Sequence, residues 1–173
     1  MQNSKNNNLP MLGVGPYYGI FSFALTILSF LYFNDIQIFQ LGIINNLFIK
    51  KCFSFISILF MLIGISLWCY VVLPSKGIRY KIEHGELATD GAYSLTRNPI
   101  YSAIFIFLIG VQMRTYNLFI FIVSLIIYIF LDVLIIKTEE QWCLDKFGKA
   151  YEEYCKRVNR IIPWFPKKIQ KNN

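Results

Sequence analysis

The residues of this chain that could do chemistry lie in two short polar segments next to hydrophobic runs. In the first, Arg97-Asn-Pro-Ile-Tyr101, a guanidinium and a phenol stand four residues apart and would share one face of a helix. The second is the acidic pair Glu139-Glu140, which follows Asp132 by about two helical turns. Arginine binds carboxylates, and glutamates accept hydrogen bonds from amino and hydroxyl groups. These side chains are therefore the candidates for a binding site.

The segment before Arg97 offers two further candidates. Tyr93 follows an Asp90-Gly91 turn and could present its aromatic face to a purine or a cation. His84 is the only histidine and stands beside acidic residues, but a lone histidine in a polar loop more often has no catalytic role. We assign it none.

Both polar segments also have a purely structural interpretation. Asn98 and Pro99 suit the N-cap and the first turn of a helix. Thr138-Glu-Glu-Gln141 has the pattern of a capping box, and acidic residues stabilise a helix N-terminus. Neither segment on its own predicts an active site, so the elements that bring them together decide the question.

Hydrophobic runs of membrane-spanning length flank these segments. The chain has 173 residues, of which 55% are hydrophobic and 16% charged, outside the usual range of soluble domains. We predict an all-α polytopic membrane bundle that forms one domain over 1–173, with 1–10 disordered and the chemistry in 83–163. Four membrane helices are expected at 17–33, 53–73, 100–113 and 118–136. The short third run is separated from the fourth by only Arg114-Thr-Tyr-Asn117, as in a helical hairpin.

The distribution of charge predicts the orientation of this bundle. An even number of spans puts the N-terminus, the segment 74–97 and the C-terminal tail on one side, and together they hold 14 of the 17 Lys and Arg residues. The positive-inside rule makes that side cytoplasmic, so we expect a multi-pass protein of a bacterial plasma membrane. Contact with anionic lipid, rather than nucleic acid, then explains the net charge of +7.

A hairpin about residues 115–116 would bring the two polar segments together. At a rise of about 1.5 Å per residue, residue 97 falls level with residue 134. The side chains expected to gather at the cytoplasmic rim are Arg97, Tyr101, Asp132, Glu139 and Glu140. A carboxylate within an apolar span needs a partner. We expect Asp132 to pair with Arg97, either as a structural ion pair or as part of a substrate site.

The C-terminal region is predicted to be amphipathic. Apolar residues at helical spacing indicate a cytoplasmic helix after the last span, with a break near Phe147-Gly148. The aromatic and basic tail from 161 to 168 is typical of a membrane interface. Residues 36–49 could lie in the interface or lengthen a neighbouring helix. Four cysteines without a Cys-x-x-Cys pair do not form a zinc-binding pattern, and we expect no metal.

Taken together, these residues resemble the superfamily of isoprenylcysteine carboxyl methyltransferases and phospholipid methyltransferases, membrane enzymes that use S-adenosylmethionine. The resemblance is carried, in order, by Leu87-Ala-Thr-Asp-Gly91-Ala-Tyr93, Arg97-Asn-Pro-Ile-Tyr101, Glu139-Glu140, Phe147-Gly148-x-x-Tyr151-x-x-Tyr154, Val158 and Ile162-Pro163. It implies methyl transfer to a small or lipid-like acceptor. It also implies a cofactor pocket lined by Leu87, Ala88, Tyr93, Arg97, Asn98, Pro99, Tyr101, Glu139 and Glu140.

Two positions depart from the pattern of the carboxyl methyltransferases in that superfamily. Those enzymes have a histidine two residues before the loop leucine, where this chain has Gly85 with His84 beside it. They also have a substrate-associated arginine four residues before the first glutamate, where this chain has Ile135. The second departure argues against a carboxylate acceptor, and leaves a phospholipid amine and a thiol as alternatives.

Two other classes of function fit the sequence. A membrane reductase could bind a nicotinamide cofactor such as NADPH at a comparable rim, without the Gly-x-Gly-x-x-Gly fingerprint that this chain lacks. A scaffold or small transporter would use Asp132 and Arg97 to hold helices together or to line a path, and would have a polar face through several spans.

Overall fold

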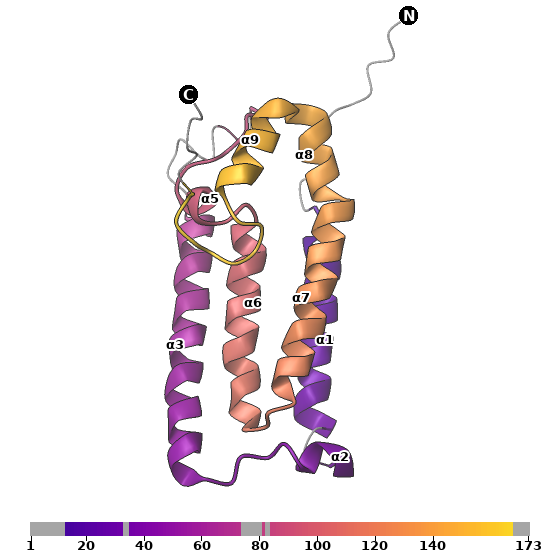
Figure 1. Ribbon diagram of the computed structural model, residues 1–173, viewed down its shortest axis with the longest axis vertical. Helices are drawn as coiled ribbons and strands as arrows, with labels where there is room; N and C mark the ends of the chain where they lie inside the picture. Colours follow the sequence, from indigo (N-terminus) through magenta and orange to yellow (C-terminus); the bar gives the residue numbers. More distant parts are fainter. Residues whose placement is uncertain (1–12, 33–34, 74–80, 82–83, 168–173) are drawn as a thin grey trace, which may run out of the picture.

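The computed structural model describes residues 13–32, 35–73, 81 and 84–167, and every regular element among them is helical. In chain order the elements are α1 (Gly15–Tyr32), α2 (Gln37–Gln40), α3 (Leu47–Val72), α5 (Ala92–Leu95), α6 (Pro99–Gln112), the 3-10 turn η1 (Met113–Thr115), α7 (Ile120–Lys137), α8 (Glu139–Phe147) and α9 (Lys149–Arg157). The all-α class is confirmed for these residues. The expected disorder at 1–10 lies outside them. The long helices run side by side, with α5, α8 and α9 at one end of the bundle and α2 at the other (Figure 1).

Three helical stretches are long and apolar enough to cross a membrane. They are α1, α3 and the stretch Ile120–Phe147, which is made by α7 and α8. The expected third span also forms a helix, but α6 and η1 together cover only Pro99–Thr115 and are shorter than the other three. The sequence prediction is therefore confirmed for three helices of membrane-spanning length and composition, and the fourth is an apolar helix below that length.

Helices α3 and α6 approach closely because each has a glycine at the contact. A Cβ atom on Gly64 would lie 2.8 Å from the backbone nitrogen of Phe107, and one on Gly110 would lie 2.8 Å from the backbone oxygen of Ser57. The Ser57 hydroxyl donates a 2.8 Å hydrogen bond to the Gly110 carbonyl. Small residues and interhelical hydrogen bonds hold helices together where lipid removes the hydrophobic driving force.

The buried face of α1 is polar, whereas its exposed face is apolar. Tyr18, Ser22, Thr26 and Ser29 are its buried residues. Gln112 on α6 donates to the Thr26 hydroxyl at 2.9 Å and accepts from the Ser124 hydroxyl of α7 at 2.8 Å. This network joins three helices, and its members satisfy one another inside the apolar bundle.

Residues 36–49 contain the short helix α2, a loop and the first residues of α3. The loop pairs with the turn between α6 and α7, since Ile44 N–H donates to the Tyr116 carbonyl and Leu118 N–H donates to the Gly42 carbonyl. Asn46 then caps α3, which begins at Leu47. Its side chain accepts hydrogen bonds from two backbone N–H groups of the first turn.

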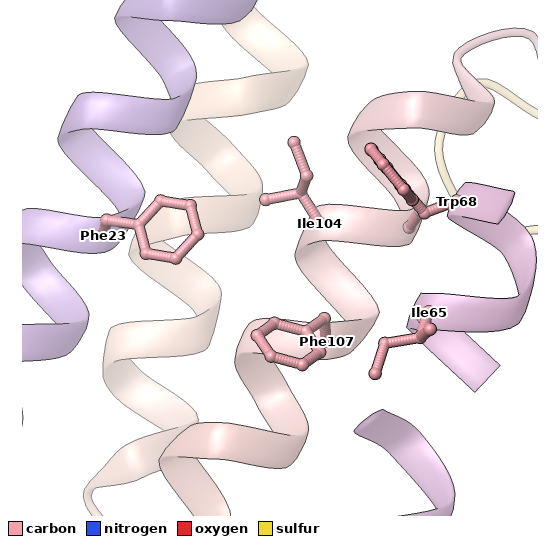
Figure 2. A pocket seen from close by; sticks show the side chains of 7 residues that line it. Phe23, Ile65, Trp68, Ile104 and Phe107 are labelled. Carbon is pink, nitrogen blue, oxygen red and sulfur yellow. The ribbon is translucent and has the colours of Figure 1, made fainter. Parts of the chain in front are cut away.

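An apolar groove of about 200 Å³ opens between α1, α3 and α6. It is lined by Phe23, Gly64, Ile65, Trp68, Ala103, Ile104 and Phe107. Figure 2 shows Phe23 on one side, Ile65 and Trp68 on the other, and Ile104 and Phe107 between them. The groove has no ionisable side chain, so the chemistry must be sought at the end of the bundle where α5, α8 and α9 meet.

Candidate functional site

A glycine reverses the chain between α8 and α9. Gly148 has a φ of 52° and ends α8 immediately before α9 begins at Lys149, which confirms the expected break. Helix α9 then turns its aromatic face back toward the bundle, and Tyr151, Tyr154 and Val158 form a buried cluster. Leu87 packs against this cluster from the loop before α5.

The segment after α9 returns to the start of α6. The backbone carbonyl of Arg160 accepts hydrogen bonds from the Thr96 hydroxyl at 2.9 Å and from the Asn98 side-chain amide at 3.0 Å. The Arg97 N–H donates to the Asn159 carbonyl at 2.9 Å. These bonds fix the side chain of Arg160 beside the ends of α6 and α7.

Four charged side chains form one network at this point. Glu140 Oε1 forms an ion pair with Arg97 Nη2 at 2.9 Å, and the Glu140 carboxylate accepts two parallel hydrogen bonds from Arg160 Nε and Nη2, each of 2.9 Å. Arg160 Nη1 also lies 2.6 Å from Asp132 Oδ1. Because the side chains of Arg97 and Glu140 are only 8% and 10% exposed, their charges need one another.

The expected pairing of Asp132 with Arg97 is wrong. Asp132 pairs with Arg160, because the reversal at Gly148 carries the C-terminal segment back to α7. Arg97 reaches Glu140 and donates from Nη1 to the Cys155 sulfur. Sequence reasoning missed Arg160. Two features of the sequence indicated this pairing. Asp132 is an acidic residue in an apolar span and needs a partner, and Arg160 is a basic residue just after the amphipathic region.

A second contact set joins Glu139 to α6 and α1. The Tyr101 hydroxyl donates to Glu139 Oε1 at 2.5 Å, and the backbone N–H of Val14 donates to the same oxygen at 2.9 Å. Tyr18 packs edge-on against the Tyr101 ring, with 5.7 Å between the ring centroids. The start of α1 therefore belongs to this site, which the sequence analysis did not anticipate.

The remaining predicted pocket residues lie around these contacts. Ala88 is buried, and Pro99 is fully buried at the first position of α6. Tyr93 belongs to α5, and its carbonyl accepts from the Tyr154 hydroxyl at 2.5 Å. Burial, and then the nearby negative charge of Glu139, raise the pKa of Tyr93. His84 is exposed on the loop before this group.

Neither predicted side-chain cap forms. Asn98 occupies the N-cap position of α6, but its side chain bonds to the Arg160 carbonyl instead of the helix. The hydroxyl of Thr138 donates back to the Leu134 carbonyl at 2.5 Å, so the expected capping box is absent from α8. At Asn98 the side chain is used to hold the C-terminal segment in place.

The thiol of Cys155 lies against the Arg97 guanidinium, but it is not an activated nucleophile. Burial raises the pKa of Cys155, and the positive charge of Arg97 only partly opposes that shift. The thiol therefore stays protonated at neutral pH. Within the described part of the chain, no cluster of three or more His, Cys, Asp or Glu residues could hold a metal ion.

The comparison with known families agrees with the resemblance seen in the sequence. The model of the phospholipid methyltransferase family matches residues 49–150, which is more than half of the chain. The chain belongs to this family. The matched segment runs from α3 to the beginning of α9, so it contains Arg97, Glu139 and Glu140 but not Val14 or Arg160.

The chain is also similar to curated members of the superfamily. It is 38% identical over 81 residues to the protein-S-isoprenylcysteine O-methyltransferase of Schizosaccharomyces pombe, an alignment that covers 46% of this chain and 34% of the relative. It is 32% identical over 82 residues to protein-S-isoprenylcysteine O-methyltransferase B of Arabidopsis thaliana, with 47% and 42% covered. It is 32% identical over 72 residues to methanethiol S-methyltransferase 1 of Bradyrhizobium diazoefficiens, with 42% and 24% covered.

In each case the alignment spans less than half of the relative's length. No solved structure matches the chain significantly. The comparisons therefore establish the superfamily.

Proposed function

We propose that this protein is a membrane methyltransferase that uses S-adenosylmethionine and acts on a small or lipid-like acceptor. The observation that carries the proposal is the buried network around Glu140, beside the Tyr101–Glu139 pair, in a chain of the phospholipid methyltransferase family. The site lies at the end of the bundle that holds most of the Lys and Arg residues, so we place it at the cytoplasmic face of the membrane.

The chemistry of the donor set fits this cofactor. Arg97 Nε is buried and has no hydrogen-bond partner among the described residues, which leaves a donor for an anionic group. The network and Glu139 together hold two arginines and three acidic side chains, a formal net charge of −1. S-adenosylmethionine has a sulfonium, an ammonium and one carboxylate, so its net charge is positive. The charge of the site is therefore opposite in sign to that of this ligand.

The residues of the site would bind the cofactor and orient it. Glu139 and Glu140 would accept hydrogen bonds from amino or ribose hydroxyl groups, and Arg97 would bind a carboxylate. Tyr93 and Tyr101 would shield the reacting atoms from water. When bound, S-adenosylmethionine would supply a methyl group on a positively charged sulfur. Positioning of two reactants can lower a barrier by about 7–11 kcal/mol, so the mechanism needs no metal or covalent intermediate.

The charges of the site favour a neutral acceptor over a carboxylate. Arg97 and Arg160 are both already paired with acidic side chains. The position at which the superfamily's carboxyl methyltransferases have an arginine is Ile135, which is fully buried in the apolar core. We therefore favour a thiol or an amine as the acceptor, with Asp132 at the edge of its site.

Titration of the purified protein with S-adenosylmethionine and, separately, with NADPH tests the proposal. We expect S-adenosylmethionine to bind and NADPH not to bind. Binding of NADPH would instead favour the reductase alternative. Glu139→Gln should weaken binding, whereas Glu153→Gln, at an exposed ion pair with Lys156, should not. Failure of the wild type to bind S-adenosylmethionine would overturn the proposal.

Incubation with methyl-labelled cofactor would identify the acceptor class. The reaction should be run with a lipid extract, a small alkanethiol and a prenylcysteine analogue in parallel. Label in the thiol or a lipid amine is expected. Label only in the prenylcysteine carboxylate would contradict the argument from Ile135 and the paired arginines.

A further inference from the structure

The start of α1 contacts the candidate site from outside the segment that matches the family. The matched residues begin at 49, whereas Val14 bonds to Glu139 across 125 positions of sequence. We infer that the backbone of Gly13 and Val14 is a positioning element that sets the orientation of the Glu139 carboxylate for ligand binding. This inference rests on the function proposed above.

Two donors on one oxygen hold the Glu139 carboxylate. Val14 N–H and the Tyr101 hydroxyl both donate to Oε1. Since these are the hydrogen bonds that the described residues make to Glu139, Oε2 is the oxygen that remains for a ligand. When one oxygen of a carboxylate is fixed by hydrogen bonds, the other oxygen needs little reorientation to accept a hydrogen bond from a ligand.

Gly13 allows this arrangement for two independent reasons. Its φ of 52° lies in the left-handed region, where a side chain is strained. In addition, a Cβ atom at this position would lie 2.0 Å from Glu139 Oε1 and 3.2 Å from the Tyr101 hydroxyl. A side chain at residue 13 would therefore have to displace the carboxylate or move the start of α1.

The chain contains two glycines that separate these reasons experimentally. Gly148 has the same φ of 52°, but a Cβ atom there meets nothing within 4 Å, so alanine would cause the strain without the collision. Gly19 lies in α1, and a Cβ atom there also meets nothing within 4 Å, so alanine at this position causes no collision. A Cβ atom at neither Gly148 nor Gly19 would reach Glu139.

The experiment compares Gly13→Ala with Gly19→Ala and Gly148→Ala in full-length protein, measuring the dissociation constant of S-adenosylmethionine and the melting temperature. We expect Gly13→Ala to weaken binding about tenfold, the loss that corresponds to one hydrogen bond to a charged group. Its melting temperature should fall about as far as that of Gly148→Ala, which causes the same backbone strain without the collision. Gly19→Ala should bind like the wild type, with its melting temperature retained or raised.

Two results would overturn the inference, and they are distinguishable. If the wild type binds the cofactor and Gly13→Ala binds equally well, Glu139 does not depend on the start of α1. If Gly13→Ala weakens binding as much in Glu139→Gln protein as in the wild type, the effect does not pass through Glu139 and comes from backbone strain. A wild type that does not bind at all would reject the proposed function, and with it this role of Gly13.

Discussion

Arg97 and Glu140 form an ion pair of 2.9 Å whose side chains are only 8% and 10% exposed. Arg160 donates two hydrogen bonds to the same carboxylate. A carboxylate that is shared by two arginines compensates both, whereas its loss leaves the buried Arg97 without its acidic partner and close to the positive charge of Arg160.

Glu140→Gln should therefore destabilise the fold strongly. Breaking a buried pair by removing one partner costs about 3–5 kcal/mol. Asp132→Asn should cost less, because the Asp132 side chain is 28% exposed and, among the described residues, forms its ion pair with Arg160 alone. Thermal unfolding of the two variants in the same detergent would check the order. A larger loss for Asp132→Asn would show that Glu140 is not the centre of the network.

Tyr101→Phe should separate binding from stability. The change keeps the buried ring and removes the hydroxyl that donates to Glu139, so cofactor binding should weaken about tenfold with little change in melting temperature. The matched control is Tyr18→Phe. The Tyr18 hydroxyl is buried and makes no hydrogen bond to the described residues, so its removal should leave binding unchanged. Equal binding by both variants would contradict a role for the Tyr101 hydroxyl.

Gln112→Ala should lower stability and leave cofactor binding intact. Gln112 is 1% exposed and joins α1 to α7 through Thr26 and Ser124. An unsatisfied buried polar group costs about 1–3 kcal/mol, and here two hydroxyls lose their partner. Gln112 is the last residue of α6, whereas Tyr101 lies in its first turn. A melting curve and a cofactor titration on the same preparation would check both parts. Lost binding in a folded variant would imply coupling along α6.

Gly64→Ala should push α3 and α6 apart. The added methyl group would meet the backbone of Phe107 at 2.8 Å, and overpacking of this kind costs about 1–3 kcal/mol. Gly19→Ala in α1 is the control, because its Cβ meets nothing within 4 Å and alanine favours a helix. Melting temperatures should fall for the first variant and be retained or raised for the second.

The fold was largely predictable because apolar runs determine membrane helices directly. The break at Gly148 was predictable too, since glycine ends helices, but its direction was not. The path of the chain after Gly148 decides that Arg160, rather than Arg97, meets Asp132. The hydrogen bond from Val14 to Glu139 could not be predicted, for a different reason. Val14 acts through a backbone N–H group, which every non-proline residue has and no sequence pattern marks.

The hydrogen bond from Val14 to Glu139 also has a consequence for biogenesis. Helix α1 is synthesised before Glu139, which follows Val14 by 125 residues, and Arg160 is made later still. The apolar helices from α1 to α7 can thus be inserted before the site is complete. Ligand that binds the finished site will stabilise α1 and the segment around Arg160 together, and a nascent protein will gain that protection only after Arg160 has been made.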